Sequence, residues 1–147
     1  MVPEIRFLSV RLRAIAQATE VEARVLDAMV FASGTEEIAI SKAEGHFGTP
    51  ITIFEVELKK KSEIKRFIGL VSEAGILQAM RGESDERTDQ DCAFHFRLDK
   101  QKAYLGELAL AEAKDVIDVS MKIGVYPARR AEAAKAVSEW LGQMQAA

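Results

Sequence analysis

The residues best suited to chemistry lie between Cys92 and Gly106, where a predicted strand runs directly into a short predicted helix. Apolar residues alternate there with His95 and Arg97, which predicts a strand that is buried on one side only. Asp99 comes next, and its carboxylate can accept hydrogen bonds from the free N–H groups at the start of a helix. The stretch therefore places charged side chains at a junction between two elements.

The first turn of that helix carries two lysines, although the helix dipole disfavours cations at this end. Arg97, Lys100, Gln101 and Lys102, together with the N–H groups of the helix, can hold an anion such as an RNA phosphate. Broken local rules are common at functional sites, which favours this hypothesis. The alternative is a solvated turn that Tyr104 anchors in the core.

A second candidate site lies in the turn Gly45–Pro50, between strands predicted at residues 37–44 and 51–58. Two glycines and a proline predict a structured turn with His46 and Phe47 at its tip. An exposed aromatic ring beside a histidine can stack on an RNA base. We favour the simpler interpretation, in which Phe47 folds back onto the sheet edge and His46 is only solvated.

Further cations are candidates for RNA contact. One group follows the strand at 51–58, at its junction with the next helix, and a solvated surface is the usual explanation for such a run. A second group lies on the polar side of the first predicted strand. The candidates are Lys59, Lys60, Lys61, Lys65 and Arg66, and then Arg11 and Arg13.

Composition limits the possible classes of protein. The chain has 147 residues, a net charge of −3 and an isoelectric point near 5.5, which excludes a strongly basic nucleic-acid binder but not a local basic patch. Its single cysteine, Cys92, excludes an internal disulfide and a cysteine-based zinc cluster. No apolar run is long enough to cross a bilayer and no signal pattern opens the chain, so we expect a cytoplasmic protein.

The periodicity predicts one α+β domain over residues 1–147, with two halves meeting near 81–91. Strands are predicted at 5–14, 37–44, 51–58, 92–98, around 108–110 and at 116–125; helices are predicted from Thr19, after Ser62, from Lys100 and after Pro127. The acidic stretch 81–91 has no apolar anchor and reads as a mobile loop or hairpin tip. We expect a mostly antiparallel sheet with helices packed on one face. The other face is expected to show Arg11, Arg13, Glu55, Glu57, His95, Arg97 and Lys122.

Catalytic patterns are missing from the sequence. His46 and His95 lack metal-ligand spacing, and there is no phosphate-binding glycine loop or nucleophile elbow. Glu55 and Glu57 share a strand face, where they suit nearby arginines better than acid–base chemistry. We expect no enzyme activity, no cofactor and no metal.

Three segments together resemble a known family: Glu44–Ile51, Phe96–Gln101, and Val116 through Ile123 to Pro127. In this order and spacing the chain is similar, from about Ile5 to Leu141, to an archaeal family described as RNA-binding and exosome-subunit-like. The resemblance implies a fold similar to the ribosomal protein that carries the five-S RNA. It also implies a non-catalytic role in RNA binding.

Two hypotheses for function follow. The first is an RNA-binding accessory protein in RNA processing or degradation, which can act inside a larger complex. The second is a homodimeric protein–protein interaction module without RNA binding, whose interfaces use the polar sheet face and the helix that carries Trp140.

Overall fold

A five-stranded sheet forms the centre of the computed structural model, which describes residues 5–112 and 114–144. The strands are β1 (Phe7–Ala16), β2 (Ala39–Glu44), β3 (Pro50–Leu58), β4 (Ala93–Asp99) and β5 (Val116–Ile123). Their order is β2-β3-β1-β5-β4, and each neighbouring pair is antiparallel. The predicted α+β class is confirmed, and strands from both halves of the chain share this sheet.

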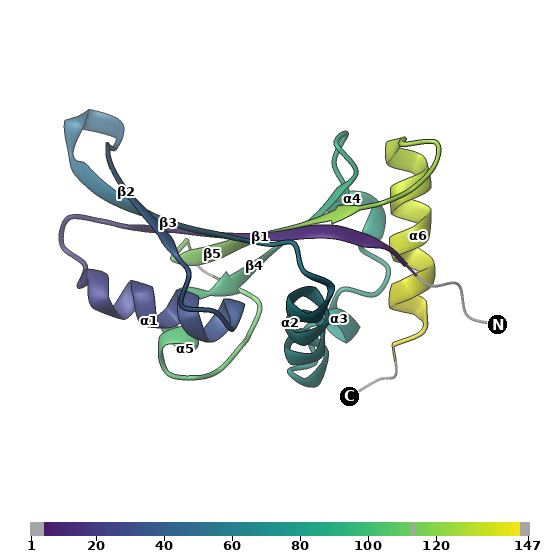
Figure 1. Ribbon diagram of the computed structural model, residues 1–147, viewed down its shortest axis with the longest axis horizontal. Coiled ribbons are helices and arrows are strands. Elements are labelled where there is room, and N and C mark those ends of the chain that lie inside the picture. Colours follow the sequence, from purple (N-terminus) through teal and green to yellow (C-terminus); the bar gives the residue numbers. More distant parts are fainter. Residues whose placement is uncertain (1–4, 113, 145–147) are drawn as a thin grey trace.

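The helices are α1 (Glu22–Ser33), α2 (Lys61–Glu73), α3 (Ile76–Ala79), α4 (Ser84–Arg87), α5 (Lys100–Tyr104) and α6 (Arg130–Gly142). A 3-10 turn, η1 (His46–Gly48), joins β2 to β3. Figure 1 shows α1, α2, α3 and α5 beneath one face of the sheet, with α6 upright at one end. The core lies between these layers and includes Phe54, Phe67, Phe94 and Phe96, all fully buried.

The strands form as the alternation predicts, because every second side chain of β1, β3 and β5 is buried under the helices. One departure is a register shift between Phe7 and Ser9, where β1 pairs with β5. Within this shift Leu8 is 42% exposed, although its alternation with Val10 and Leu12 predicts a buried position. Phe7 instead lies edge-on against Trp140, with ring centroids 4.9 Å apart. The final helix is therefore packed on the sheet, and its buried tryptophan is no exposed interface anchor.

Two predicted helix starts are wrong. Helix α1 begins at Glu22 after Val21, without a side-chain cap from Thr19, because residues 17–20 form a turn closed by Glu20. Helix α2 begins at Lys61, so Ser62 lies inside it rather than capping it. The end of α1 follows a common sequence rule, since Gly34 comes after it in the left-handed conformation, which glycine adopts without strain.

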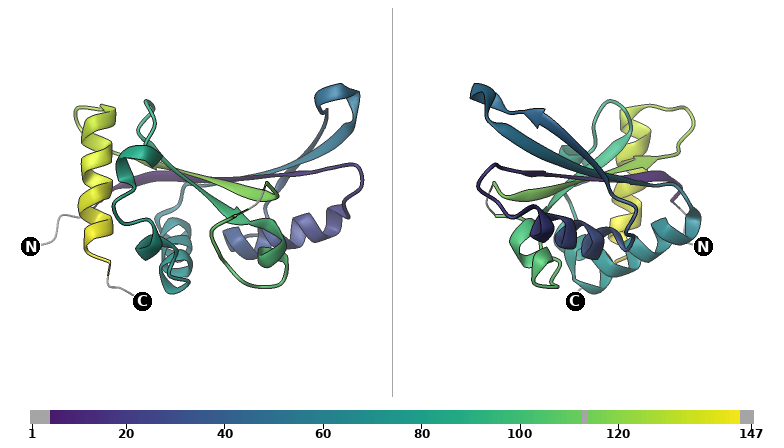
Figure 2. Two further views of the ribbon diagram at one scale, coloured as in Figure 1. Left: turned by 180° about the vertical axis from the view of Figure 1, so that it is seen from behind. Right: turned by 60° about the vertical axis from the view of Figure 1, so that its left-hand side comes forward.

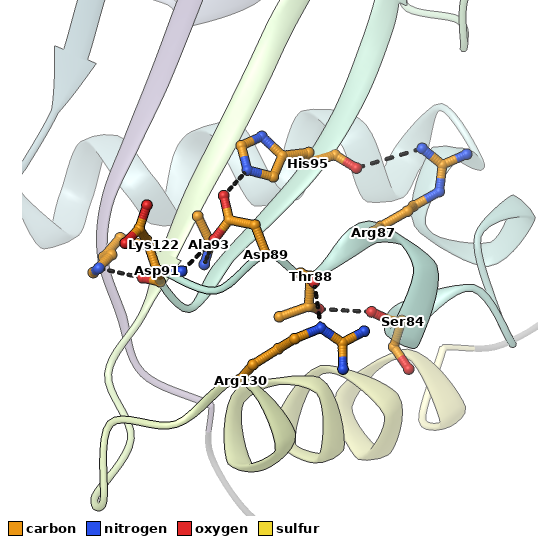
Figure 3. Close-up of polar contacts among 9 residues, drawn as sticks. All are labelled: Ser84, Arg87, Thr88, Asp89, Asp91, Ala93, His95, Lys122 and Arg130. Carbon is orange, nitrogen blue, oxygen red and sulfur yellow. Dashed lines mark hydrogen bonds and ion pairs between the residues drawn. The ribbon is translucent and has the colours of Figure 1, made fainter.

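The acidic stretch 81–91 contains α4 and is anchored, so it is not the mobile loop of the first interpretation. Its last residues belong to a hairpin tip, as the alternative predicted, because Thr88 bridges antiparallel to Phe94. Its anchors are polar: the buried Thr88 hydroxyl donates to the carbonyl of Ser84 at 2.6 Å. Arg130, at the start of α6, donates to the carbonyl of Thr88 at 3.0 Å (Figure 3). The same guanidinium group pairs with Asp85 at 3.2 Å. Buried hydrogen bonds thus replace the apolar anchor that the sequence lacks.

The strand predicted around residues 108–110 does not form. Leu110 makes one isolated bridge to Leu98, and Ala109 accepts a hydrogen bond from the N–H of Asp99. Within the described residues, no helix is long and apolar enough to cross a membrane.

The face of the sheet opposite the helices is bare over its middle (Figures 1 and 2). The β2–β3 hairpin rises on this side at one end, and the connection from β5 to α6 rises at the other. We call this surface the open face; it is defined by Arg11, Arg13, Glu55, Glu57, His95, Arg97, Asp118, Ser120 and Lys122.

Candidate nucleic-acid interface

Lys100, the centre of the predicted phosphate site, is buried; only 3% of its side chain is exposed. Its ammonium group lies 2.8 Å from Glu20, 2.6 Å from Asp115 and 2.8 Å from the carbonyl oxygen of Ile15. Because an ammonium group has only three N–H donors, all of them are used within the chain. The prediction that Lys100 holds a phosphate is therefore wrong.

The other members of that site are not brought together either. The side chain of Gln101 donates to Asp115 at 2.7 Å, and Asp99 accepts from the backbone N–H of Lys102 at 2.9 Å, as the predicted N-cap. Lys102 is exposed on the helical side of the sheet, whereas Arg97 points from β4 onto the open face. The alternative, with Tyr104 anchored in the core, is also wrong, since that side chain is 38% exposed beneath Arg24.

Charged side chains cross the open face in rows, because strand pairing places them side by side. In one row Glu55, Arg13, Asp118 and Arg97 come from β3, β1, β5 and β4 in turn. Glu55 pairs with Arg13 at 3.3 Å, and Asp118 with Arg97 at 3.1 Å. Opposite charges on neighbouring strands attract, so this row alternates in sign across the sheet.

The next row contains Glu57, Arg11, Ser120 and His95 on the same four strands. Glu57 lies 2.9 Å from Arg11 and 3.2 Å from Lys59. Hydrogen bonds from these two cations hold the pKa of Glu57 below its ordinary value. The prediction that both glutamates pair with arginines is confirmed.

The tip of the β2–β3 hairpin is exposed rather than folded back, so the interpretation we favoured for Phe47 is wrong. Phe47 is 95% exposed and has a positive φ of 73°, a conformation that non-glycine residues rarely adopt. Its ring lies edge-on to His46, with centroids 4.5 Å apart. Tyr126, in the connection at the other end of the open face, is 99% exposed.

The cations at the junction of β3 with α2 share no common partner, and Lys59 pairs with Glu57 of β3. Lys60, Lys61 and Lys65 are exposed, while Arg66 reaches back to the carbonyl of Gly34 at 3.3 Å. Whether they contact RNA stays a prediction.

Sequence reasoning missed one cluster at the outer edge of β4. Asp89 bonds to His95, and Arg87 donates to the carbonyl of His95 at 3.4 Å (Figure 3). Both partners come from the stretch interpreted as a mobile loop or hairpin tip. Asp89 reaches His95 across the turn that precedes β4, and Arg87 reaches it because α4 packs beside β4. No spacing rule applied to the sequence joins these residues.

Comparisons with known proteins agree on one family. A family model described as RNA binding matches residues 9–123. A curated RNA-binding protein of Pyrococcus abyssi is 33% identical to this chain, over 96% of it and 97% of the relative.

Solved structures agree with this result. A DUF54 protein of Methanothermobacter thermautotrophicus is 26% identical, with a TM-score of 0.78 over 94% of this chain and 99% of the other. A DUF54-family protein of Archaeoglobus fulgidus is 37% identical, with a TM-score of 0.75 over 88% of this chain and 96% of the other.

Proposed function

Since the chain belongs to the RNA-binding family whose model spans residues 9–123, we propose that it binds single-stranded or looped RNA on its open face. The RNA-binding family that the three sequence segments suggested is thereby confirmed. Its description as exosome-subunit-like and the likeness to the five-S-RNA-binding ribosomal protein stay predictions. The observation that supports the site is the sheet surface bare of helices, from which Arg11, Arg13 and Arg97 project with 60%, 40% and 72% of their side chains exposed.

These arginines are available to RNA although each has a carboxylate partner. An ion pair between exposed side chains contributes only about 0–1 kcal/mol, because water screens it. A phosphate offers the guanidinium group a stronger, two-pronged set of hydrogen bonds. Exchanging a carboxylate for a phosphate therefore costs little, and the rows keep the arginines extended before RNA arrives.

Exposed aromatic residues at both ends of the open face support the same proposal. Phe47 and Tyr126 bury almost nothing in the fold, at 95% and 99% exposed. Stacking of a base on an aromatic ring contributes about 1–3 kcal/mol per base in single-stranded complexes. Bases of a single strand or loop are free to stack in this way, whereas those of a duplex are not.

We further propose that the protein is a non-catalytic accessory factor in cytoplasmic RNA processing or degradation, in the manner of an exosome subunit. The chain's net charge of −3 fits a protein that binds RNA through a limited site rather than through bulk attraction.

The test is a fluorescence-anisotropy titration with single-stranded and duplex RNA at two salt concentrations. Replacing Arg11 and Arg13 together by Gln should weaken binding of the single strand about tenfold or more and flatten its salt dependence by about two phosphates. Lys135→Gln is the control for loss of a positive charge outside the site, because Lys135 is exposed on α6; it removes one charge where the double variant removes two. Equal binding by the double variant and the wild type would place the site elsewhere, with the cations at Lys59–Arg66 next to be tested.

A second candidate is the homodimer, which the outer edge of β2 favours. Every residue of β2 is exposed, including Ile40 at 52%, and β2 pairs only with β3 in the described sheet. Such an edge is a template for pairing with another strand. Analytical ultracentrifugation of the wild type and of Ile40→Lys tests it; a wild type that sediments as a monomer would remove this candidate.

A further inference from the structure

A hollow of about 510 Å³ opens along the outer edge of β4. Arg87 and Asp89 line it from the α4 side, and His95 and Arg97 line it from β4. Glu86 of α4 and Asp118 of β5, at the border with the open face, complete this charged set. His95 and Arg97 project from the same side of one strand, two residues and roughly 7 Å apart.

The imidazole of His95 is held in a fixed orientation. Its Nε2 bonds to one oxygen of Asp89, whose other oxygen accepts from the N–H groups of Asp91 and Ala93 at 2.9 and 3.0 Å (Figure 3). Burial favours the neutral form of Asp89, but these hydrogen bonds outweigh it and keep its pKa below the ordinary value. The carboxylate thus remains charged and occupied, and the other ring nitrogen, Nδ1, lies outside these contacts.

Arg87 carries a donor that its surroundings do not satisfy. Its Nη2 lies 3.3 Å from Glu83, and its Nη1 reaches the carbonyl of His95. Its Nε is buried and has no acceptor within the described part of the chain. A buried donor without a partner costs free energy, so this position favours an acceptor supplied from outside the chain.

We propose that the hollow binds one phosphate group between the guanidinium groups of Arg87 and Arg97, beside His95. The carboxylates of Asp89 and Asp118 already hold His95 and Arg97, which leaves the outer nitrogens of Arg97 for phosphate oxygens. The Nε of Arg87 is buried, so the Arg87 side chain must turn toward the hollow before this donor reaches the phosphate. Planar guanidinium groups match phosphate oxygens well. The proposal rests on the proposed function where the phosphate belongs to an RNA strand that leaves the open face over β4; a free nucleotide supplies the same group.

Nuclear magnetic resonance of the two histidine rings tests the proposal, with His46→Gln to assign the signals. The probes are inorganic phosphate, adenosine 5′-monophosphate and a short single-stranded RNA. We expect each probe to shift the ring signals of His95, and inorganic phosphate to leave those of His46 in place. Either an unshifted His95 signal with all three probes, or equal shifts of both rings with phosphate, would overturn the proposal.

Arg87→Lys keeps the positive charge but removes the Nε donor, and we expect it to weaken phosphate binding about tenfold. Arg24→Lys is the matched control. Arg24 belongs to α1 and lies over the ring of Tyr104 of α5, outside the hollow. Thermal unfolding checks that each variant folds, and Arg97→Gln tests the exposed side of the site if Arg87→Lys does not fold. Phosphate affinities equal to wild type in Arg87→Lys or Arg97→Gln would overturn the proposal.

Failure of this proposal and of the proposed function are distinguishable. RNA binding in the anisotropy assay without a shift of His95 rejects the hollow and keeps the open face. A phosphate shift of His95 without RNA binding rejects the proposed function and keeps the hollow as a site for free phosphate or nucleotide.

Discussion

Lys100 and Arg97 stand three residues apart, yet they lie in opposite environments. Lys100 is 3% exposed, on the helical side of the sheet, and is bonded to two carboxylates and a carbonyl. Arg97 is 72% exposed, on the open face, and has one carboxylate partner. Burial makes the first set of contacts strong and irreplaceable, while water makes the second weak and exchangeable. A cation beside carboxylates therefore stabilises the fold in one place and remains available for a ligand in the other.

The largest expected effect is on stability at the buried lysine. Lys100→Ala leaves Glu20 and Asp115 facing each other without their shared cation, and we expect a loss of about 2–4 kcal/mol, discounted because both carboxylates touch water. The sequence alone predicts the opposite, equal or slightly higher stability, because the helix dipole disfavours a cation in the first turn. Urea denaturation measures the loss, with the exposed Lys102→Ala as control within about 0.5 kcal/mol. Equal midpoints for the two variants would remove the contrast between the regions.

The stabilisation that the Lys100 contacts provide should depend on pH through the carboxyl group of Asp115. Burial favours its neutral form, but hydrogen bonds from Gln101 and Lys100 prevail and hold its pKa below the ordinary value. The unfolded chain therefore binds protons first on acidification, so the stabilisation is present above about pH 4 and is lost as pH falls through the folded pKa.

We expect Asp115→Asn to cost about 1 kcal/mol at pH 7, reduced by solvent screening because the side chain is 39% exposed. The cost should shrink toward pH 3. Denaturant midpoints at several pH values measure this, with Asp118→Asn on the open face as control. A cost that is constant with pH would contradict the conclusion that folding lowers the pKa of Asp115.

On the open face, substitutions should leave stability almost unchanged. Arg11 and Arg13 are replaceable because their ion pairs are exposed, and we expect the double glutamine variant to lose no more than about 1 kcal/mol. Urea denaturation beside the RNA titration separates the two effects. A loss comparable to that of Lys100→Ala would show that the rows of charged side chains stabilise the sheet and are not available to bind RNA.

The smallest expected effect on stability is at the hairpin tip. Phe47 buries almost nothing and has a positive φ, so Phe47→Gly should leave stability equal or up to about 1 kcal/mol higher, since glycine adopts this conformation without strain. The same change should weaken binding of single-stranded RNA by about 1–3 kcal/mol. Tyr104→Ala, on the helical side, is the aromatic control in the RNA titration. Unchanged RNA affinity in Phe47→Gly would exclude the tip from the site.

Local pattern determined much of the fold. Alternation predicted the strands and their polar side, because the period of two depends only on neighbours in the chain. Asp99 was recognised as a helix cap for the same reason, since its partner, the N–H of Lys102, is three residues away. The pairing of Glu55 and Glu57 with arginines also followed from shared strand faces.

Only the tertiary structure decided which charges are buried and which are exposed. Glu20 and Asp115 reach Lys100 from distant parts of the chain, and Arg87 meets His95 because α4 packs beside β4. Burial and hydrogen bonding across such separations carry no local signal. For that reason the sequence identified the charged stretch around Asp99, whereas the fold assigned Lys100 to the interior and Arg97 to the surface.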